Sequence, residues 1–176
     1  GYPEATFTFA VARALRKRLS ALGAKVVMTR TRNSRKLWGP CVDVRGRAGN
    51  AHTLGLQGPA DAKISLHGDG ASADGHGFHV IAPVRHRTHA ESARLGKATR
   101  SALRRGGFAR ASYVAGGTGL VYRGDLATLN LSRVPAVMVE LGNMRNAHDA
   151  RVMRSKKGRQ RYAEALQRGL RAFLSR

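Results

Sequence analysis

Three side chains have the chemistry of a metal or substrate site: Glu140, His67 and Glu4. Glu140 follows the apolar run 136–139 and precedes a glycine and two asparagines, the pattern of a buried strand that ends in a turn. His67 also ends an apolar run, and the Gly-Asp-Gly after it allows a close approach to a metal or substrate. Because ligands of open α/β sheets bind at the C-terminal edge, these strand ends are candidates for one site.

Each candidate also has a purely structural interpretation. Glu140 could be held by backbone N–H groups or by an arginine such as Arg145. His67 could pack as an ordinary structural histidine, and Glu4 lies in the first turn of a helix, where a carboxylate complements the helix dipole. The three residues form a site only if the fold brings them to one rim of the sheet.

The elements that would position these residues alternate along the chain. Apolar spacing and turn residues predict helices at 4–22, 42–51, 88–105 and 157–174, and strands at 25–29, 62–66, 78–82, 120–122 and 136–141. Thr88 and Glu91 have the spacing of a capping box, and 30–41 and most of 111–130 have the composition of loops. We therefore expect a single α/β domain, with a twisted, mostly parallel or mixed sheet and helices on both faces.

The composition limits the class of protein and its partners. The net charge of +22 favours anionic partners, but arginine is spread along the chain, so charge alone names none. Aromatic residues make up 6% and mostly occupy apolar helix faces, which argues against specific nucleic-acid binding. No apolar run reaches the roughly 18 residues of a membrane span. A single cysteine, Cys41, excludes an internal disulfide framework and a cysteine-based zinc ribbon.

Several other catalytic signatures are absent from the sequence. There is no His-Glu-x-x-His, no Gly-x-Ser-x-Gly and no P-loop ending in Lys-Ser or Lys-Thr. We assign surface or supporting roles to the six remaining histidines: His52, His76, His79, His86, His89 and His148.

Taken in order, the motifs resemble one known family. They are a glutamate at a helix start, Gly-x-x-Val-Val-Met-Thr-Arg (23–30), Asp-x-Arg-x-x-x-Gly-Asn-Ala (43–51), Ala-Lys-Ile-Ser-Leu-His-Gly-Asp (62–69), Gly-Phe-His-Val (77–80) and Pro-Ala-Val-Met-Val-Glu-Leu-Gly-Asn-Met-Arg-Asn (135–146). From Glu4 to the C-terminus the chain is similar to zinc-dependent N-acetylmuramoyl-L-alanine amidases of the AmiC-like (amidase-3) type. The sequence at 39–43, Gly-Pro-Cys-Val-Asp, resembles that of compact actinobacterial cell-wall amidases.

The resemblance implies a set of site residues. Glu4 and His67 match the family's second and third zinc ligands, and Glu140 matches its catalytic glutamate. The first zinc histidine lies in a loop after a strand upstream of the Glu4 helix, and neither is among these residues. We therefore expect residues 1–176 to be an amidase-3-like catalytic domain that lacks its N-terminal strand and loop. Relatives also carry a cysteine at the position of Cys41 that can pair with another, and no partner is present here.

The resemblance also implies a reaction and partners. Zinc-activated water would cleave the amide between the lactyl group of N-acetylmuramic acid and L-alanine of the stem peptide, with Arg123, Asp69 and Asn143 as candidate substrate-binding residues. Peptidoglycan or a muropeptide would be the substrate, with anionic envelope polymers as further partners. We expect a secreted or cell-envelope (periplasmic) monomer whose signal segment is not in this chain. The alternatives are a catalytically impaired basic wall-binding domain, a zinc peptidase acting on stem peptides, and a nucleic-acid-binding module driven by charge.

Overall fold

The computed structural model describes residues 1–34, 39–84 and 86–175. In chain order the elements are α1 (Glu4–Ser20), α2 (Val42–Arg47), β1 (Lys63–Asp69), β2 (His79–Pro83), α3 (His89–Arg105), the short 3₁₀ helix η1 (Ala115–Gly117), β3 (Leu120–Arg123), α4 (Ala127–Asn130), β4 (Ala136–Asn143), α5 (Ala147–Arg154) and α6 (Lys156–Leu174).

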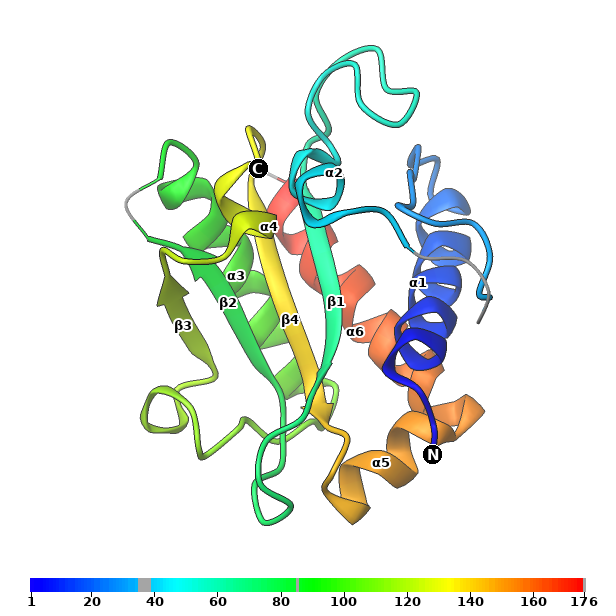
Figure 1. Ribbon diagram of the computed structural model, residues 1–176, viewed down its shortest axis with the longest axis vertical. Helices are drawn as coiled ribbons and strands as arrows, with labels where there is room; N and C mark the ends of the chain where they lie inside the picture. The colour runs from blue at the N-terminus through cyan, green and yellow to red at the C-terminus, as the bar shows by residue number, and fades with distance from the viewer. Residues whose placement is uncertain (35–38, 85, 176) are drawn as a thin grey trace.

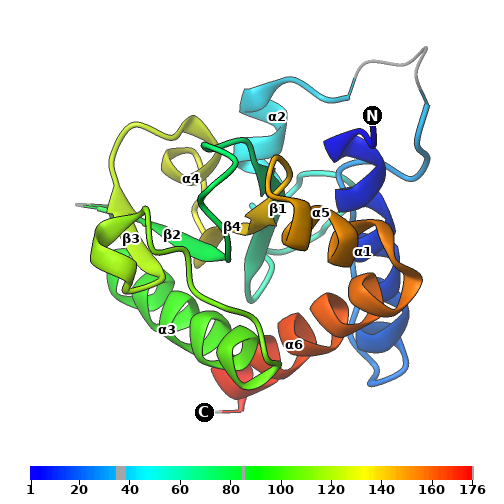
Figure 2. The same ribbon diagram turned by 90° about the horizontal axis from the view of Figure 1, so that it is seen from below.

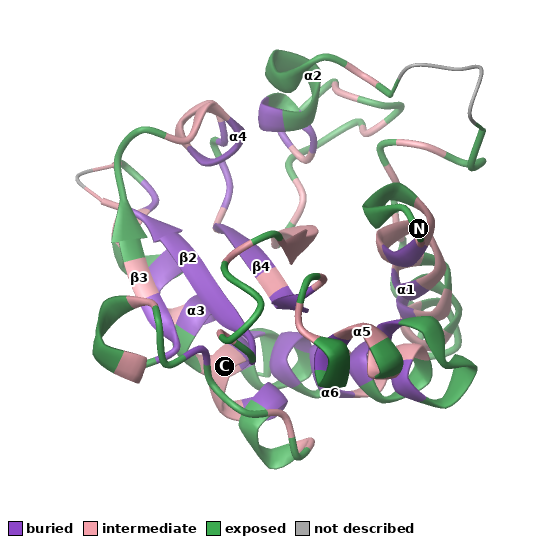
Figure 3. Cartoon of the chain, turned by 60° about the horizontal axis from the view of Figure 1, so that its bottom comes forward, coloured by how far each residue is buried: buried purple, intermediate pink, exposed green. Residues whose placement is uncertain are grey.

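The four strands form one mixed sheet in the order β1-β4-β2-β3 (Figure 1). β1 is parallel to β4 and β2 is parallel to β3, whereas β2 and β4 are antiparallel. The expected α/β domain with a mixed sheet is confirmed. β4 lies inside the sheet and is buried at seven of its eight residues, as its apolar sequence predicts (Figure 3).

Alternate residues of β4 point to opposite faces of the sheet. Val137, Val139 and Leu141 join the main core, which the long helices α1, α3 and α6 cover from one side (Figure 2). Met138 packs in a smaller cluster with Leu129 of α4 on the other side. Glu140 shares the parity of Met138, so its side chain lies on this second face, away from the long helices.

A half-buried lysine anchors the short helices α2 and α4 to the second face. Nζ of Lys63 donates to the carbonyl oxygens of Gly46 at 2.5 Å and Thr128 at 2.8 Å. Burial lowers the pKa of Lys63 to about 8. A neutral amine still has two N–H groups, enough for both carbonyls, so β1, α2 and α4 are joined at one point.

The expected strand at 25–29 is wrong. Those residues are described but belong to no strand, and their nearest side-chain anchors are on α1. Arg30 donates to the carbonyl oxygen of Ala5, and the amide of Asn33 donates to Oγ1 of Thr6 at 3.0 Å. An apolar, β-branched run becomes a strand only where a neighbouring chain pairs with it, and here the segment lies against a helix instead.

Other expectations at the level of elements need smaller corrections. Thr88 precedes α3 but caps it with no side-chain hydrogen bond, because its Oγ1 contacts His86 and Ser92. Glu91 pairs with Arg94, so no capping box forms. The helices α4 and α5 were not expected, and the expected loop at 30–41 lies partly outside the described residues.

Candidate active site

The N-terminus of α1 meets the end of β1 through Glu4 and His67. Oε1 of Glu4 lies 3.0 Å from Nδ1 of His67 and accepts the backbone N–H of Gly68 at 3.3 Å. The hydrogen bond with His67 is the main cause that lowers the pKa of Glu4, and burial opposes it. The sequence therefore brings together two residues that are 63 positions apart.

Gly68, next to His67, leaves room for the side chain of Met144. A Cβ at this position would lie 2.9 Å from both Cγ and Sδ of Met144 and 3.5 Å from Phe7 of α1. A side chain at residue 68 would require the side chain of Met144 to move, whereas its contact with Phe7 would be an ordinary van der Waals one. The Gly after His67 thus has a packing reason to be glycine.

Glu140 lies beside this pair on the neighbouring strand. In the parallel pairing of β1 and β4 it is the register partner of His67, and in the antiparallel pairing of β2 and β4 it is the partner of His79. Glu140 does not end its strand, as the sequence suggested, because pairing continues to Asp69 and Asn143 after a register shift. The carboxylate is therefore presented from the face of the sheet near its C-terminal edge.

The environment of Glu140 suits proton transfer. Burial raises the pKa of Glu140 to about 7; the charge of His67 opposes this rise, and the carboxylates of Asp69 and Glu4 add to it. Within the described part of the chain, the buried Oε2 has no hydrogen-bond partner, and Arg145 forms no ion pair with it. The alternative in which Glu140 is a structural carboxylate held by arginine or backbone groups finds no support in this geometry.

His67 is held by partners on both ring nitrogens. Nε2 lies 3.0 Å from Oγ of Ser65, and Nδ1 faces Glu4. Burial opposes a charge on His67, but the hydrogen bond with Glu4 and the charges of Glu140 and Glu4 outweigh it, so the pKa of His67 is raised. An imidazole and a carboxylate facing each other form half of a typical zinc ligand set.

The three candidate substrate residues have different surroundings. Asp69 accepts the hydroxyl of Tyr113 at 2.9 Å on the rim next to His67. The buried amide of Asn143 donates to the carbonyl oxygens of Ser72 and Gly75 at 2.6 and 2.7 Å, so it braces the loop after β1. Arg123 lies on β3, two strands from Glu140, and Nε donates to Asp125 at 2.9 Å. The structure thus brings Asp69 to the candidate site and pairs Arg123 elsewhere.

The sequence reasoning missed Asp149, which braces the same region from α5. Its buried Oδ2 accepts the backbone N–H groups of Gly77 at 2.7 Å and Asn143 at 2.8 Å. A Cβ on Gly142 would lie 3.0 Å from this oxygen, so the absence of a side chain at residue 142 leaves room for the carboxylate. Asp149 follows the motif Glu-Leu-Gly-Asn by only a few residues, but nothing local distinguishes it from a helix-start aspartate.

Replacing Asp149 by alanine is expected to lower the free energy of unfolding by about 3 kcal/mol, because two buried N–H groups lose their acceptor. Urea unfolding measures the change. The exposed Asp74 lies in the braced loop, and Asp74→Ala serves as the control, with an expected change within about 0.5 kcal/mol. Equal effects of the two substitutions would contradict the bracing role.

The separation of the Glu4 and His67 donor atoms can be compared with the separation of two ligands on one zinc ion. Two ligands about 2.0–2.1 Å from a tetrahedral ion lie roughly 3.3 Å apart, and the Glu4 oxygen and His67 nitrogen lie 3.0 Å apart. Carboxylate oxygen and imidazole nitrogen are ordinary zinc ligands, so this pair fits. No group of three or more His, Cys, Asp or Glu residues in the described ranges is arranged to hold a metal ion. The described residues therefore offer a divalent metal two neighbouring donors at this place, and not three.

Comparisons with known proteins show what the whole chain is similar to. Residues 1–172 match the amidase-3 family, described as N-acetylmuramoyl-L-alanine amidase. The chain is 41% identical over 178 residues to N-acetylmuramoyl-L-alanine amidase Rv3717 of Mycobacterium tuberculosis, covering 99% of this chain and 70% of that protein.

Solved structures show the same similarity. The N-acetylmuramyl-L-alanine amidase Ami1 of Mycobacterium smegmatis superimposes with a TM-score of 0.87 at 37% identity, covering 99% of this chain and 78% of that one. The apo form of Ami1 from Mycobacterium abscessus gives a TM-score of 0.88 at 41% identity, with 99% and 79% covered.

Proposed function

The chain belongs to the amidase-3 family of N-acetylmuramoyl-L-alanine amidases, and from this membership we propose that it cleaves the amide between the lactyl group of N-acetylmuramic acid and L-alanine of the stem peptide. The observation that carries the proposal is the close grouping of Glu4, His67 and Glu140. An imidazole–carboxylate pair that fits zinc lies next to a carboxylate whose pKa is raised to about 7.

In this proposal Glu4 and His67 hold a zinc ion. When bound, zinc polarises a carbonyl group and makes water more acidic. The family resemblance implies a third protein ligand, a histidine that these residues do not include. The position of the pair, on the face of the sheet beside Glu140, would direct the amide of the substrate to this carboxylate.

Glu140 moves the proton in the proposed reaction. As a carboxylate it accepts a proton from the attacking water, and it then delivers that proton to the nitrogen of L-alanine as the amide bond breaks. A pKa near the working pH allows one group to do both steps. Asp69, fixed by the hydroxyl of Tyr113, lies on the rim where the stem peptide would enter, and Asn143 shapes that rim through the loop it braces. Arg123 is not needed in this scheme.

Mass spectrometry of peptidoglycan digested by the zinc-supplemented chain tests this function. We expect free stem peptides and glycan strands without peptides. Shortened stem peptides would show a zinc peptidase instead, and an unchanged digest from a protein that still sediments with cell walls would show a wall-binding domain. Either result would overturn the proposed activity.

The proposed substrate implies where the protein acts. We place the protein outside the cytoplasmic membrane, in the cell envelope or secreted, and expect it to act as a monomer. None of the helices in the described ranges is long and apolar enough to cross a membrane.

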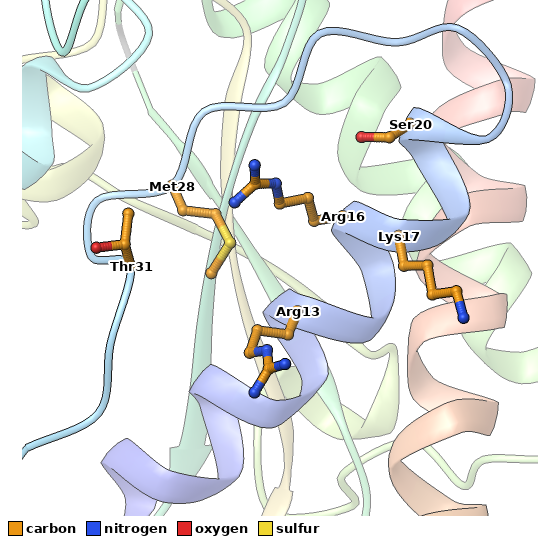
Figure 4. Close-up of a pocket in the computed structure, with 6 residues that line it drawn as sticks. All are labelled: Arg13, Arg16, Lys17, Ser20, Met28 and Thr31. Carbon is orange, nitrogen blue, oxygen red and sulfur yellow. The ribbon is translucent and has the colours of Figure 1, made fainter.

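A cationic groove supports a second partner, an anionic envelope polymer. It encloses about 360 Å³ between α1 and the segment that follows it, and its lining residues are Arg13, Arg16, Lys17, Ser20, Met28 and Thr31. Figure 4 shows Arg16 extending from α1 toward Met28, with Arg13 about one turn away on the same helix. Like charges at a spacing of three and four residues repel each other, and the described residues offer these cations no ion pair. Repeated phosphate or carboxylate groups would supply the missing counter-charge.

Replacing Arg13, Arg16 and Lys17 together by alanine is expected to weaken binding to cell walls roughly tenfold, because each exposed ion pair contributes about 0.5 kcal/mol. Co-sedimentation with cell walls measures the affinity, and added salt should reduce the difference between the variant and the unaltered chain. The control removes three exposed cations of α3, with Lys97, Arg104 and Arg105 replaced by alanine. Equal weakening by both triple variants would contradict a specific groove. Tight, salt-dependent binding of DNA by the groove would favour the nucleic-acid alternative.

A further inference from the structure

His79 lies on the other side of Glu140 from the proposed zinc pair. It is a residue of β2, it is only 6% exposed, and its register partner in the antiparallel pairing with β4 is Glu140. Directly opposed residues of two strands point to the same face of the sheet, with Cβ atoms about 4.5–5.5 Å apart. His67, Glu140 and His79 therefore form one row across β1, β4 and β2, three strands that lie side by side in Figure 1.

Two buried polar atoms in this row lack partners among the described residues. They are Nδ1 of His79 and Oε2 of Glu140. A buried polar atom without a hydrogen bond costs about 1–3 kcal/mol, and such atoms in native proteins often have a functional reason. Because the two atoms belong to directly opposed residues whose side chains lie on one face of the sheet, each could supply the partner that the other lacks.

The surroundings of His79 fix its ring and keep it neutral. The ring of Tyr113 packs edge-on against it at 6.3 Å between centroids, and the hydroxyl of Tyr113 is tied to Asp69. Gly75 leaves the room for Tyr113, since a Cβ there would lie 2.6 Å from its ring. Burial lowers the pKa of His79, with Asp69 opposing and Arg123 reinforcing the effect. A neutral imidazole has one N–H to donate.

We propose that His79 is a positioning residue that donates its Nδ1–H to Oε2 of Glu140 and so leaves the other carboxylate oxygen to accept the proton of the attacking water. The hydrogen bond satisfies both buried atoms and favours the ionised carboxylate, which is the form a general base needs. This inference rests on the proposed function of Glu140. It assigns to His79 no contact with substrate or metal.

Three substitutions distinguish this role from simple packing. His79→Asn places an amide N–H close to the position of Nδ1, His79→Gln places one close to Nε2, and His79→Ala removes both. Loss of a group that orients a functional residue typically costs 10–100-fold. We expect His79→Ala and His79→Gln to lower kcat for stem-peptide release by about this factor without a matching rise in KM, whereas His79→Asn recovers most of it. Zinc content should stay at the wild-type value in all three.

A second readout needs neither zinc nor turnover. Nitrogen-15 spectra of the metal-free protein should show His79 as the Nδ1–H tautomer, and Glu140→Leu, which removes the acceptor, should shift that signal. An Nε2–H tautomer would overturn the proposal, as would wild-type kcat in His79→Ala or equal losses in the asparagine and glutamine variants. If His79→Ala does not fold, the comparison of kcat between His79→Asn and His79→Gln still tests the proposal.

The outcomes also separate this inference from the proposed function. If Glu140→Gln keeps full amidase activity, the proposed role of Glu140 fails whatever the His79 variants do. If Glu140→Gln is inactive and His79→Ala is unchanged, only the role of His79 fails.

Discussion

Glu140→Gln is expected to lower kcat for the release of stem peptides by about 10³-fold, within the range that general acid–base catalysis contributes. Glutamine has nearly the same shape but cannot accept the proton of water. The fold should be retained, because the described residues form no hydrogen bond with Oε2 of Glu140, and the carbonyl oxygen of glutamine can still accept the one proposed from His79. Turnover of purified muropeptides measures the effect, and circular dichroism checks the fold.

The pH dependence has a defined sign. The base is the ionised carboxylate, so the rate should rise with pH through the pKa of Glu140, which burial places at about 7 in the metal-free chain. A bound divalent cation favours the ionised form and moves this rise to lower pH. Glu164 on α6, a half-buried carboxylate that pairs with Arg168, gives the matched control, and Glu164→Gln should keep wild-type kcat. A Glu140→Gln enzyme with wild-type turnover would exclude Glu140 as the base.

His67→Ala and Glu4→Gln are each expected to weaken zinc binding by at least about 100-fold, because even residues outside the ligand set change metal affinity by 10–100-fold. Each substitution removes one of the two proposed ligands. Competition with a chromophoric chelator gives the dissociation constants. Chelator treatment of the unaltered chain should abolish amide cleavage, and added zinc should restore it.

His52, an exposed histidine in the segment between α2 and β1, supplies the control for zinc binding. His52→Ala should keep the wild-type affinity. If all three variants bind zinc equally, the ion is held elsewhere, and the family resemblance does not extend to the metal site of this chain.

Much of the fold could be predicted because local pattern and tertiary environment agree. The run 136–139 is apolar and β-branched, and β4 is indeed buried inside the sheet. The long helices α1, α3 and α6 have apolar faces at helical spacing and form the main core. The run at 25–29 has similar composition, but strand formation depends on a pairing partner that a local pattern cannot supply.

The candidate site was predictable to the extent that motifs mark it. Glu4 begins a helix, and His67 and Glu140 each follow an apolar run that the sequence makes visible, although both strands continue beyond these residues. The fold places the three side by side. His79 and Asp149 gave no such signal: His79 matters because antiparallel pairing sets it opposite Glu140, and Asp149 because α5 returns to the end of β4. The positions of His79 and Asp149 depend on strand order and register, which a local sequence pattern does not specify.

Anomalous diffraction at the zinc edge from crystals grown with zinc tests the central claim most directly. The claim is that Glu4, His67 and Glu140 form one metal-dependent hydrolytic site. We predict a single strong peak bound by Oε1 of Glu4 and a ring nitrogen of His67, on the face of the sheet that carries Glu140. A peak bound by other residues, with the pair of Glu4 and His67 unchanged, would contradict it.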